Sequence, residues 1–338
     1  MLSRFIFCAL LALPFAIACG SGGESAPEST PPVLIGEPVG ATSTPRSDDS
    51  PDEQDSADDP DNGGEVVSLD WLAGGASFPA VPSPFAPTHE SEGLRDAVES
   101  VLDGRDGRFS VIVRHLADGR EVSINAGETY YAASLFKAAV LLTAYRLRDA
   151  GTLDFAKEVV ITEESAEHDL GTLEYLELEV GDKVTIGDAV KAMIVVSDTT
   201  LANLVLEEID YAPVDAVLAS VGATVMTVSD RDLPTTAEDM AVLISAIATG
   251  NGVSEASRQE MLSLMAQEWF GEGVVAGIPI GTLYAHKTGS FSEATHDVAI
   301  VEGSAGPYLI AVLSDGSGEW EPVAAVSAAV WHYFEVNP

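Results

Sequence analysis

The hydrophobic and polar positions of this 338-residue chain follow the helical period and the strand period in separate regions. Residues 91–102 repeat with the helical period and predict a helix. Residues 109–116 and 121–125 are rich in β-branched residues and predict two strands. The Asp118-Gly119 pair between them is typical of a hairpin turn, so these strands are expected to be neighbours in one sheet.

The stretch from Tyr131 to Tyr145 is apolar on almost every side, which predicts a buried helix that ends near Gly151. Further helices follow, and Thr185 with Asp188 forms a capping box at the start of the first of them. They are predicted over residues 185–196, from Thr200, from Pro213, over 236–249 and over 254–269.

Strand patterns return at residues 282–287, 297–302 and 308–314, before a last helix over 319–334. The order along the chain is therefore strands, helices and strands again. If the early and late strands pair, the fold is α/β (α+β): one antiparallel sheet of N- and C-terminal strands, flanked by helices, with an inserted all-helical lobe.

The N-terminus has the features of a targeting segment. Arg4 precedes an apolar run over residues 5–17, which is too short to span a membrane. Residues 1–18 are predicted to be a signal peptide, and Cys19 resembles the lipidated cysteine of a bacterial lipobox. A plain signal peptide with an incidental Cys19 is the alternative. An exported lipoprotein is expected, at the outer face of the cytoplasmic membrane or on the periplasmic side of the envelope.

Residues 19–88 are rich in Pro, Ser, Gly and Asp, so they are predicted to be a disordered acidic tether. Residues 89–338 then form the working domain. With 54 acidic and 16 basic residues the chain carries a net charge of −38, which argues against nucleic acid or anionic lipid surfaces as partners.

The cysteines and histidines of the chain do not indicate a cofactor or a metal site. The chain has two cysteines, Cys8 in the signal peptide and Cys19, so no thiol remains in the body for a disulfide, a thiolate metal site or a cysteine nucleophile. The six histidines are scattered without metal-ligand spacing. No cofactor and no metal are therefore predicted, and the protein is expected to be a monomer.

Ser134 and Lys137 open the buried helix and are three residues apart, so they share one helix face. A serine hydroxyl is a weak nucleophile until an adjacent group accepts its proton. A lysine amine serves when its pKa falls, which burial and a second nearby cation both promote. The pair therefore predicts a serine nucleophile with a lysine base, against the alternative of an ordinary helix start.

Two further motifs follow in order. Ser197-Asp198-Thr199 interrupts two predicted helices, and Lys287-Thr288-Gly289-Ser290 is placed at a strand end. Ser-x-x-Lys, Ser-Asp-x and Lys-Thr-Gly in this order resemble class A β-lactamases and penicillin-binding proteins. Residues 178–204 and 235–241 are also similar to that family. The resemblance implies a β-lactamase/transpeptidase-like fold and a serine hydrolase.

The resemblance implies a role for each motif residue. Ser134 would be the acylated nucleophile, Lys137 its base or proton relay, and Ser197 the relay to the departing nitrogen. Lys287 would hold a substrate carboxylate, and the backbone N–H groups of Ser134 and Ser290 would bind the oxyanion. The substrate-binding residues implied are Lys287, Thr288, Ser290 and Thr199.

The chain departs from the family pattern at the second motif and in the omega loop. Thr199 stands where the family has asparagine, and no glutamate occurs between Glu208 and Glu238, where the family carries its deacylating base. Asp230 or Asp232 is a candidate substitute. In the other interpretation Asp232, with its neighbour Arg231, only holds the loop.

A third departure lies after Lys-Thr-Gly, where His296 replaces an arginine offered to the substrate; it either contributes to the site or pairs with Asp297. The first functional prediction is β-lactam hydrolysis through an acyl-enzyme. The alternatives are a D,D-peptidase or other amide or ester hydrolase that releases β-lactams slowly, and a non-catalytic lipoprotein that binds β-lactams or peptidoglycan. The partners expected are a small β-lactam or cell-wall peptide, and a membrane through the lipid.

Overall fold

The computed structural model describes residues 66–72, 74–81, 87–167 and 169–338, and all of these belong to one compact unit. The predicted signal peptide, Cys19 and the tether up to residue 65 lie outside the described residues. Within the described ranges, no helix is both long and apolar enough to cross a membrane.

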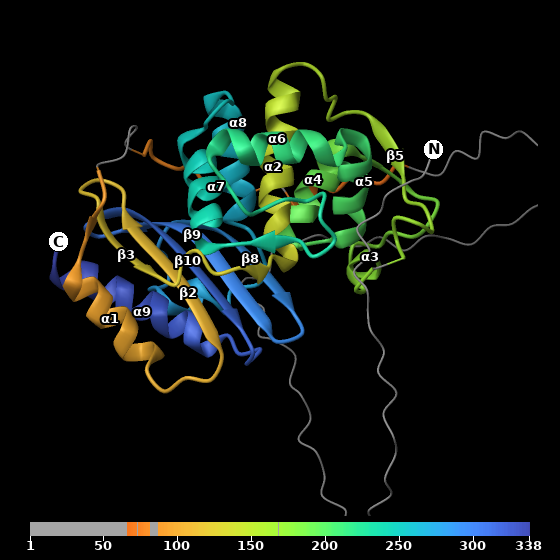
Figure 1. Ribbon diagram of the computed structural model, residues 1–338. Helices are drawn as coiled ribbons and strands as arrows, with labels where there is room; N and C mark the ends of the chain where they lie inside the picture. Colours follow the sequence, from red (N-terminus) through yellow and green to blue (C-terminus); the bar gives the residue numbers. More distant parts are fainter. Residues whose placement is uncertain (1–65, 73, 82–86, 168) are drawn as a thin grey trace, which may run out of the picture. The chain divides into compact units, whose positions relative to one another are not determined.

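A six-stranded sheet forms the centre of the unit, in the order β1-β3-β2-β10-β9-β8 (Figure 1). β2 pairs antiparallel with β10, so the early and late strands meet in the middle of the sheet and the predicted arrangement is confirmed. The short β1 is parallel to β3, and the other pairs are antiparallel. The strands are β1 (His89–Glu90), β2 (Arg108–His115), β3 (Arg120–Ile124), β8 (Tyr284–Phe291), β9 (Ala294–Gly303) and β10 (Gly306–Asp315).

Successive side chains along a strand point to opposite faces of the sheet, so they pack into two separate cores. Val111 and Val113 of β2 pack under α1 (Glu92–Leu102) and α9 (Glu321–Val336) on one face of the sheet. Ile112, between them, faces the larger core under the inserted helices. The sheet therefore lies between two helical layers, which Figure 1 shows from the side.

The inserted lobe is built around α2 (Phe136–Asp149), whose residues from Phe136 to Tyr145 are all buried, as its apolar pattern predicts. A turn of 3₁₀ helix, Ala133–Leu135, leads into it. The lobe also contains a small sheet of β5 (Glu158–Val160) and β6 (Lys183–Thr185). The other lobe helices are α3 (Thr172–Tyr175), α4 (Ile186–Val195), α5 (Thr199–Ile209), α6 (Tyr211–Val221), α7 (Ala237–Thr249) and α8 (Glu255–Met265).

Part of the predicted tether packs on the lobe. Leu69, Leu72 and Phe78 are buried in the larger core. Arg258 of α8 donates to the Phe78 carbonyl (3.1 Å), and Lys191 of α4 pairs with Asp70 (2.8 Å). Residues 66–72 and 74–81 are therefore part of the folded unit, which extends further toward the N-terminus than residue 89.

Two element boundaries differ from those predicted. The helix expected to reach residue 269 ends at Met265, because the Trp269 N–H donates to the carbonyl of Val195 (3.0 Å) instead of to its own helix. The Lys-Thr-Gly motif lies inside β8 rather than at its end, since β8 runs on to Phe291. Both differences affect the site described next.

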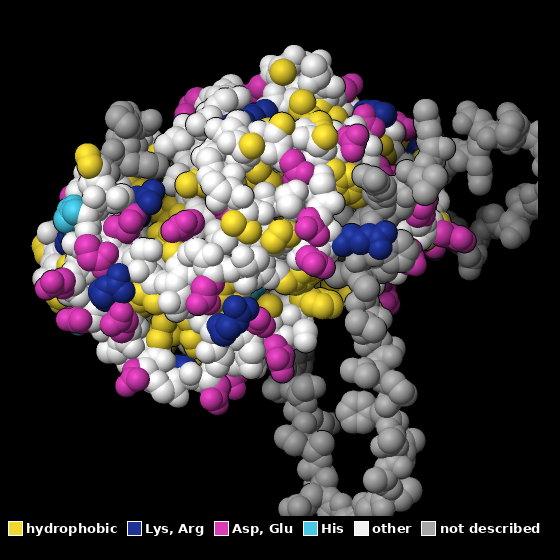
Figure 2. All heavy atoms as spheres, in the orientation of Figure 1, with side chains coloured by type: hydrophobic (Ala, Val, Ile, Leu, Met, Phe, Trp, Pro, Cys, Tyr) yellow, Lys and Arg dark blue, Asp and Glu magenta, His cyan; other side chains and the backbone are white. Residues whose placement is uncertain are grey.

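The surface carries the acidic excess of the sequence. On the face seen in Figure 2, Asp and Glu side chains lie scattered among fewer Lys and Arg side chains. Several of the basic groups are engaged in ion pairs, such as Arg105 with Glu321 and Lys157 with Glu208.

Candidate active site

Ser134 lies in the 3₁₀ turn that starts α2, and the chain before it is held firmly. β4 (Tyr130–Tyr131) pairs with β7 (Pro234–Thr235), and the Ala132 N–H donates to the carbonyl of Leu233 (2.8 Å). Ala133 adopts a φ of 46°, a left-handed conformation that a residue with a side chain rarely adopts. The backbone therefore presents the serine in a constrained position at a helix start.

Lys137 connects Ser134 to the second motif. Its amine lies 3.0 Å from Ser134 Oγ, 3.3 Å from Ser197 Oγ and 3.2 Å from Thr199 Oγ1, and it donates to the Ser197 carbonyl at 2.5 Å. The side chain of Lys137 is fully buried. The structure thus brings together the hydroxyl, the amine and the second hydroxyl that the sequence singled out.

The second motif is a tight turn between α4 and α5. Ser197 has a φ of 55°, and Asp198 caps α5 by accepting the Leu201 N–H at 2.6 Å. Burial raises the pKa of Asp198, although the hydrogen bonds from Leu201 and Thr172 oppose it. The turn aims Ser197 Oγ at both lysines, because Lys287 Nζ lies 3.1 Å from the same oxygen.

Lys287 has a partner that the sequence did not reveal, Glu268. The Lys287 amine and the Thr288 hydroxyl both donate to Glu268 Oε1, the latter at 2.6 Å, and the Thr288 N–H donates to Oε2 at 2.9 Å. Glu268 stands in the loop that α8 leaves at Met265. The available signal was a carboxylate directly before two aromatic residues, and it was missed because the helix was predicted to continue to residue 269.

The glycine of the third motif allows a close backbone contact. A Cβ added at Gly289 would lie 2.9 Å from the Ala132 carbonyl and 3.2 Å from the Leu135 nitrogen. β8 therefore packs directly on the turn that carries Ser134. Because Ser290 follows Gly289 on β8, we expect this contact to set the distance between the N–H groups of Ser134 and Ser290, the expected oxyanion donors.

We expect Gly289→Ala to lower the rate of Ser134 acylation about a hundredfold, since a displacement of about 1 Å has that effect on positioned groups. Gly127→Ala is the matched control, because a Cβ at Gly127 would meet nothing within 4 Å. Single-turnover acylation of the two variants measures the effect. Equal rates in both would show that the contact between β8 and the turn does not position the donors.

The loop before β7 is held by a buried carboxylate that the sequence did not reveal. Asp239 accepts the N–H groups of Thr224 (2.8 Å), Val225 (2.9 Å) and Met226 (2.6 Å). Asp230 and Asp232 are both exposed, and Asp230 accepts the Asp232 N–H within a turn (3.0 Å). This geometry favours the structural interpretation of the two aspartates over a deacylating base.

His296 is fully buried and does not pair with Asp297, so that expectation was wrong. Its Nδ1 accepts the Ser314 N–H (3.1 Å), which leaves Nε2 to donate to the Tyr131 carbonyl (2.9 Å). Burial lowers the pKa of His296, so the ring is neutral and structural.

Asp297 instead pairs with His286, the residue before Lys287, at 3.1 Å. Burial and the charge of Lys287 lower the pKa of His286. The charge and the hydrogen bond of Asp297, together with the charge of Glu268, raise it by more. The pKa therefore lies above its ordinary value of 6.5. Two carboxylates and two basic groups thus form a buried cluster behind the third motif.

The raised pKa of His286 predicts a loss of stability at alkaline pH. The folded chain holds a proton that the unfolded chain releases near pH 6.5, so the contribution is complete below that pH and is lost as pH rises through the folded pKa. Urea unfolding from roughly pH 6 to 9 measures it. We expect the free energy of unfolding to depend less steeply on pH in His286→Gln than in the wild type. In His332→Gln, whose ring is exposed, the pH dependence should be unchanged. An unchanged pH dependence in both variants would contradict the prediction.

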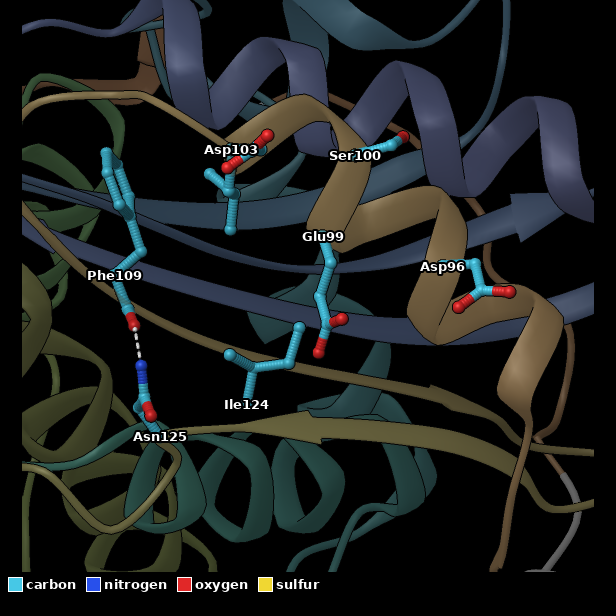
Figure 3. A pocket seen from close by; sticks show the side chains of 8 residues that line it. Asp96, Glu99, Ser100, Asp103, Phe109, Ile124 and Asn125 are labelled. Carbon is cyan, nitrogen blue, oxygen red and sulfur yellow. Dashed lines mark hydrogen bonds between the residues drawn. The ribbon is translucent and has the colours of Figure 1, made fainter.

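A pocket between α1 and the start of β2 lies outside this site. Figure 3 shows Asp96, Glu99 and Asp103 of the α1 region on one side and Phe109 and Ile124 on the other. α1 covers the face of the sheet opposite to α2, so this pocket does not reach Ser134. Among the described residues, no cluster of three His, Cys, Asp or Glu could hold a metal ion.

Comparison with known proteins gives a consistent picture. A model of the beta-lactamase enzyme family matches residues 93–334. Beta-lactamase L2 of Stenotrophomonas maltophilia is 29% identical over 257 residues, which cover 66% of this chain and 79% of that protein. A beta-lactamase of Mycobacterium tuberculosis is 27% identical over 233 residues, which cover 63% and 74%.

Solved structures show the same fold. PBP-A superposes with a TM-score of 0.69 at 20% identity, over 75% of this chain and 99% of that one. A beta-lactamase from Sphaerobacter thermophilus has a TM-score of 0.65 at 22% identity, over 73% and 98%.

Proposed function

This chain belongs to the beta-lactamase enzyme family, among the penicillin-recognising serine enzymes, and from this premise we propose that it hydrolyses β-lactams through an acyl-enzyme on Ser134. The observation that carries the proposal is the position of the Lys137 amine. It lies within 3.3 Å of the hydroxyls of Ser134, Ser197 and Thr199.

The proposed reaction begins with Lys137 in its uncharged form. Its nitrogen takes the proton of Ser134 as the serine oxygen bonds to the carbonyl carbon of the β-lactam. The proton passes through Ser197 to the ring nitrogen as the carbon–nitrogen bond breaks, which leaves an acyl-enzyme. Backbone N–H groups of Ser134 and Ser290 bind the oxyanion, and attack by water completes the hydrolysis.

A second candidate is a D,D-peptidase-like enzyme. β-Lactams acylate such an enzyme, but the acyl-enzyme is hydrolysed slowly. The loop over residues 224–234 favours it, because the carboxylates in that loop, Asp230 and Asp232, are exposed. Acylation needs Lys137 and Ser197, whereas release needs a base for water, and the two steps are separable. The N-terminal sequence supports export and a lipid on Cys19 for either candidate.

Intact-mass spectrometry of the full chain over time, with a penicillin and with a chromogenic cephalosporin, tests the proposal. A transient adduct with steady product release supports β-lactam hydrolysis. A lasting adduct supports the peptidase-like candidate instead. No adduct with either compound contradicts both.

A further inference from the structure

The donors expected to bind a substrate carboxylate already hold one. The Lys287 amine, the Thr288 hydroxyl and the Thr288 N–H all donate to the two oxygens of Glu268. This arrangement of three donors around one carboxylate is how proteins bind anions. The anion in this arrangement belongs to the protein itself.

Glu268 also cancels the positive charge of this end of the site. The side chains of Glu268 and Lys287 are both 0% exposed, so water does not screen the pair. The other lysine of the site, Lys137, lies against Ser134. At longer range the net charge of −38 repels anions as well.

Exposed aromatic residues follow Glu268 in the chain. Trp269 and Phe270 directly follow Glu268 and are exposed. The Tyr175 ring lies 4.7 Å from the Trp269 ring, and Thr172, at the start of the same helix, donates to Asp198 of the second motif. The loop that carries Glu268 therefore exposes apolar rings on the surface of the protein.

We infer that Glu268 is a specificity-determining residue that removes the advantage of a substrate carboxylate at this end of the site. The favoured substrates carry an uncharged group there, an ester or amide with an apolar substituent. The inference rests on the proposed function, since it concerns the substrates that acylate Ser134. Glu268 is not assigned a part in the chemical steps.

A pair of substrates that differ in one charge tests the inference. A chromogenic cephalosporin and its methyl ester at the ring carboxylate acylate the protein, and the ratio of the two rates is taken within each variant. A difference between variants in the amount of folded protein therefore does not change the ratio. In the wild type we expect the free acid to have no advantage over the ester.

In Glu268→Gln the acylation rate of the free acid should rise about tenfold or more relative to that of the ester. The reason is that a like charge facing a bound group weakens its binding by at least that factor. Glu272→Gln is the matched control, since Glu272 lies in the same loop and is exposed. A wild type that prefers the free acid about a hundredfold, with the same ratio in Glu268→Gln, would overturn the inference.

A second readout does not depend on acylation. Sulfate titrated at constant ionic strength, with the intrinsic tryptophan fluorescence as the signal, reports anion binding to Lys287 and Thr288. Glu268→Gln should bind sulfate about tenfold more tightly than the wild type or Glu272→Gln. Equal affinities would overturn the inference even if Ser134 is acylated. If no acylation occurs, tighter sulfate binding supports the role of Glu268 while the proposed function fails.

Discussion

Replacing Ser134 with alanine is expected to abolish covalent labelling by penicillin and to lower β-lactam turnover by on the order of 10⁴-fold or more. The alanine removes the oxygen that forms the bond, which lies in the turn that packs against Gly289 of β8. Intact-mass spectrometry counts the adduct, and the turnover of a chromogenic cephalosporin measures the residual rate.

Ser100→Ala is the control for this experiment. Ser100 is an exposed hydroxyl on α1, on the opposite face of the sheet, and its loss should change neither readout. Labelling of Ser134→Ala at the wild-type level would mean that another group is acylated. The nucleophile assignment would then be wrong.

Replacing Lys137 with alanine should slow acylation by on the order of 10²–10⁴-fold, the range for loss of a positioned general base. The same change leaves the Ser197 carbonyl without its 2.5 Å donor, which costs stability of about 1–3 kcal/mol. Stopped-flow acylation separates the two effects, because the fraction of folded protein is measured independently by urea unfolding.

Lys157→Ala is the matched control, since Lys157 is exposed and pairs with Glu208 at the surface. We expect its acylation rate to match that of the wild type. An unaffected rate in Lys137→Ala would instead assign the proton transfer to Ser197 or to water.

The sequence predicts the order of the elements and the Lys137–Ser134 pair because both depend on local patterns, whereas the pairing of the early with the late strands rested on the resemblance to a known family. An apolar helix must be buried, and two residues three apart on it must share a face. The Ser197 turn follows in the same way, since a helix ends and another begins around it. These features need no knowledge of distant contacts.

Glu268 was not predicted because its role depends on distant contacts alone. It reaches Lys287 from the loop after α8, where the Trp269 N–H donates to the carbonyl of Val195, far away in the chain. The contact of Asp239 with the loop was not predicted for the same reason. Asp239 lies three residues after the capping residue Thr236, a position that indicates the start of a helix but not a contact with the loop. The pairing of Asp297 with His286 rather than His296 depends on the two-residue alternation of β9 and β8.

The packing of residues 66–72 and 74–81 against the inserted lobe has a consequence for the stability of shortened forms of the protein. Removing everything before residue 89 would expose the surfaces that Leu69, Leu72 and Phe78 cover. At about 1.5–3 kcal/mol for each large apolar side chain, the loss approaches the whole stability of an average domain, about 5–15 kcal/mol. Proteolytic trimming in this region would therefore threaten the enzyme itself, and the practical N-terminal limit of the domain lies before Val66.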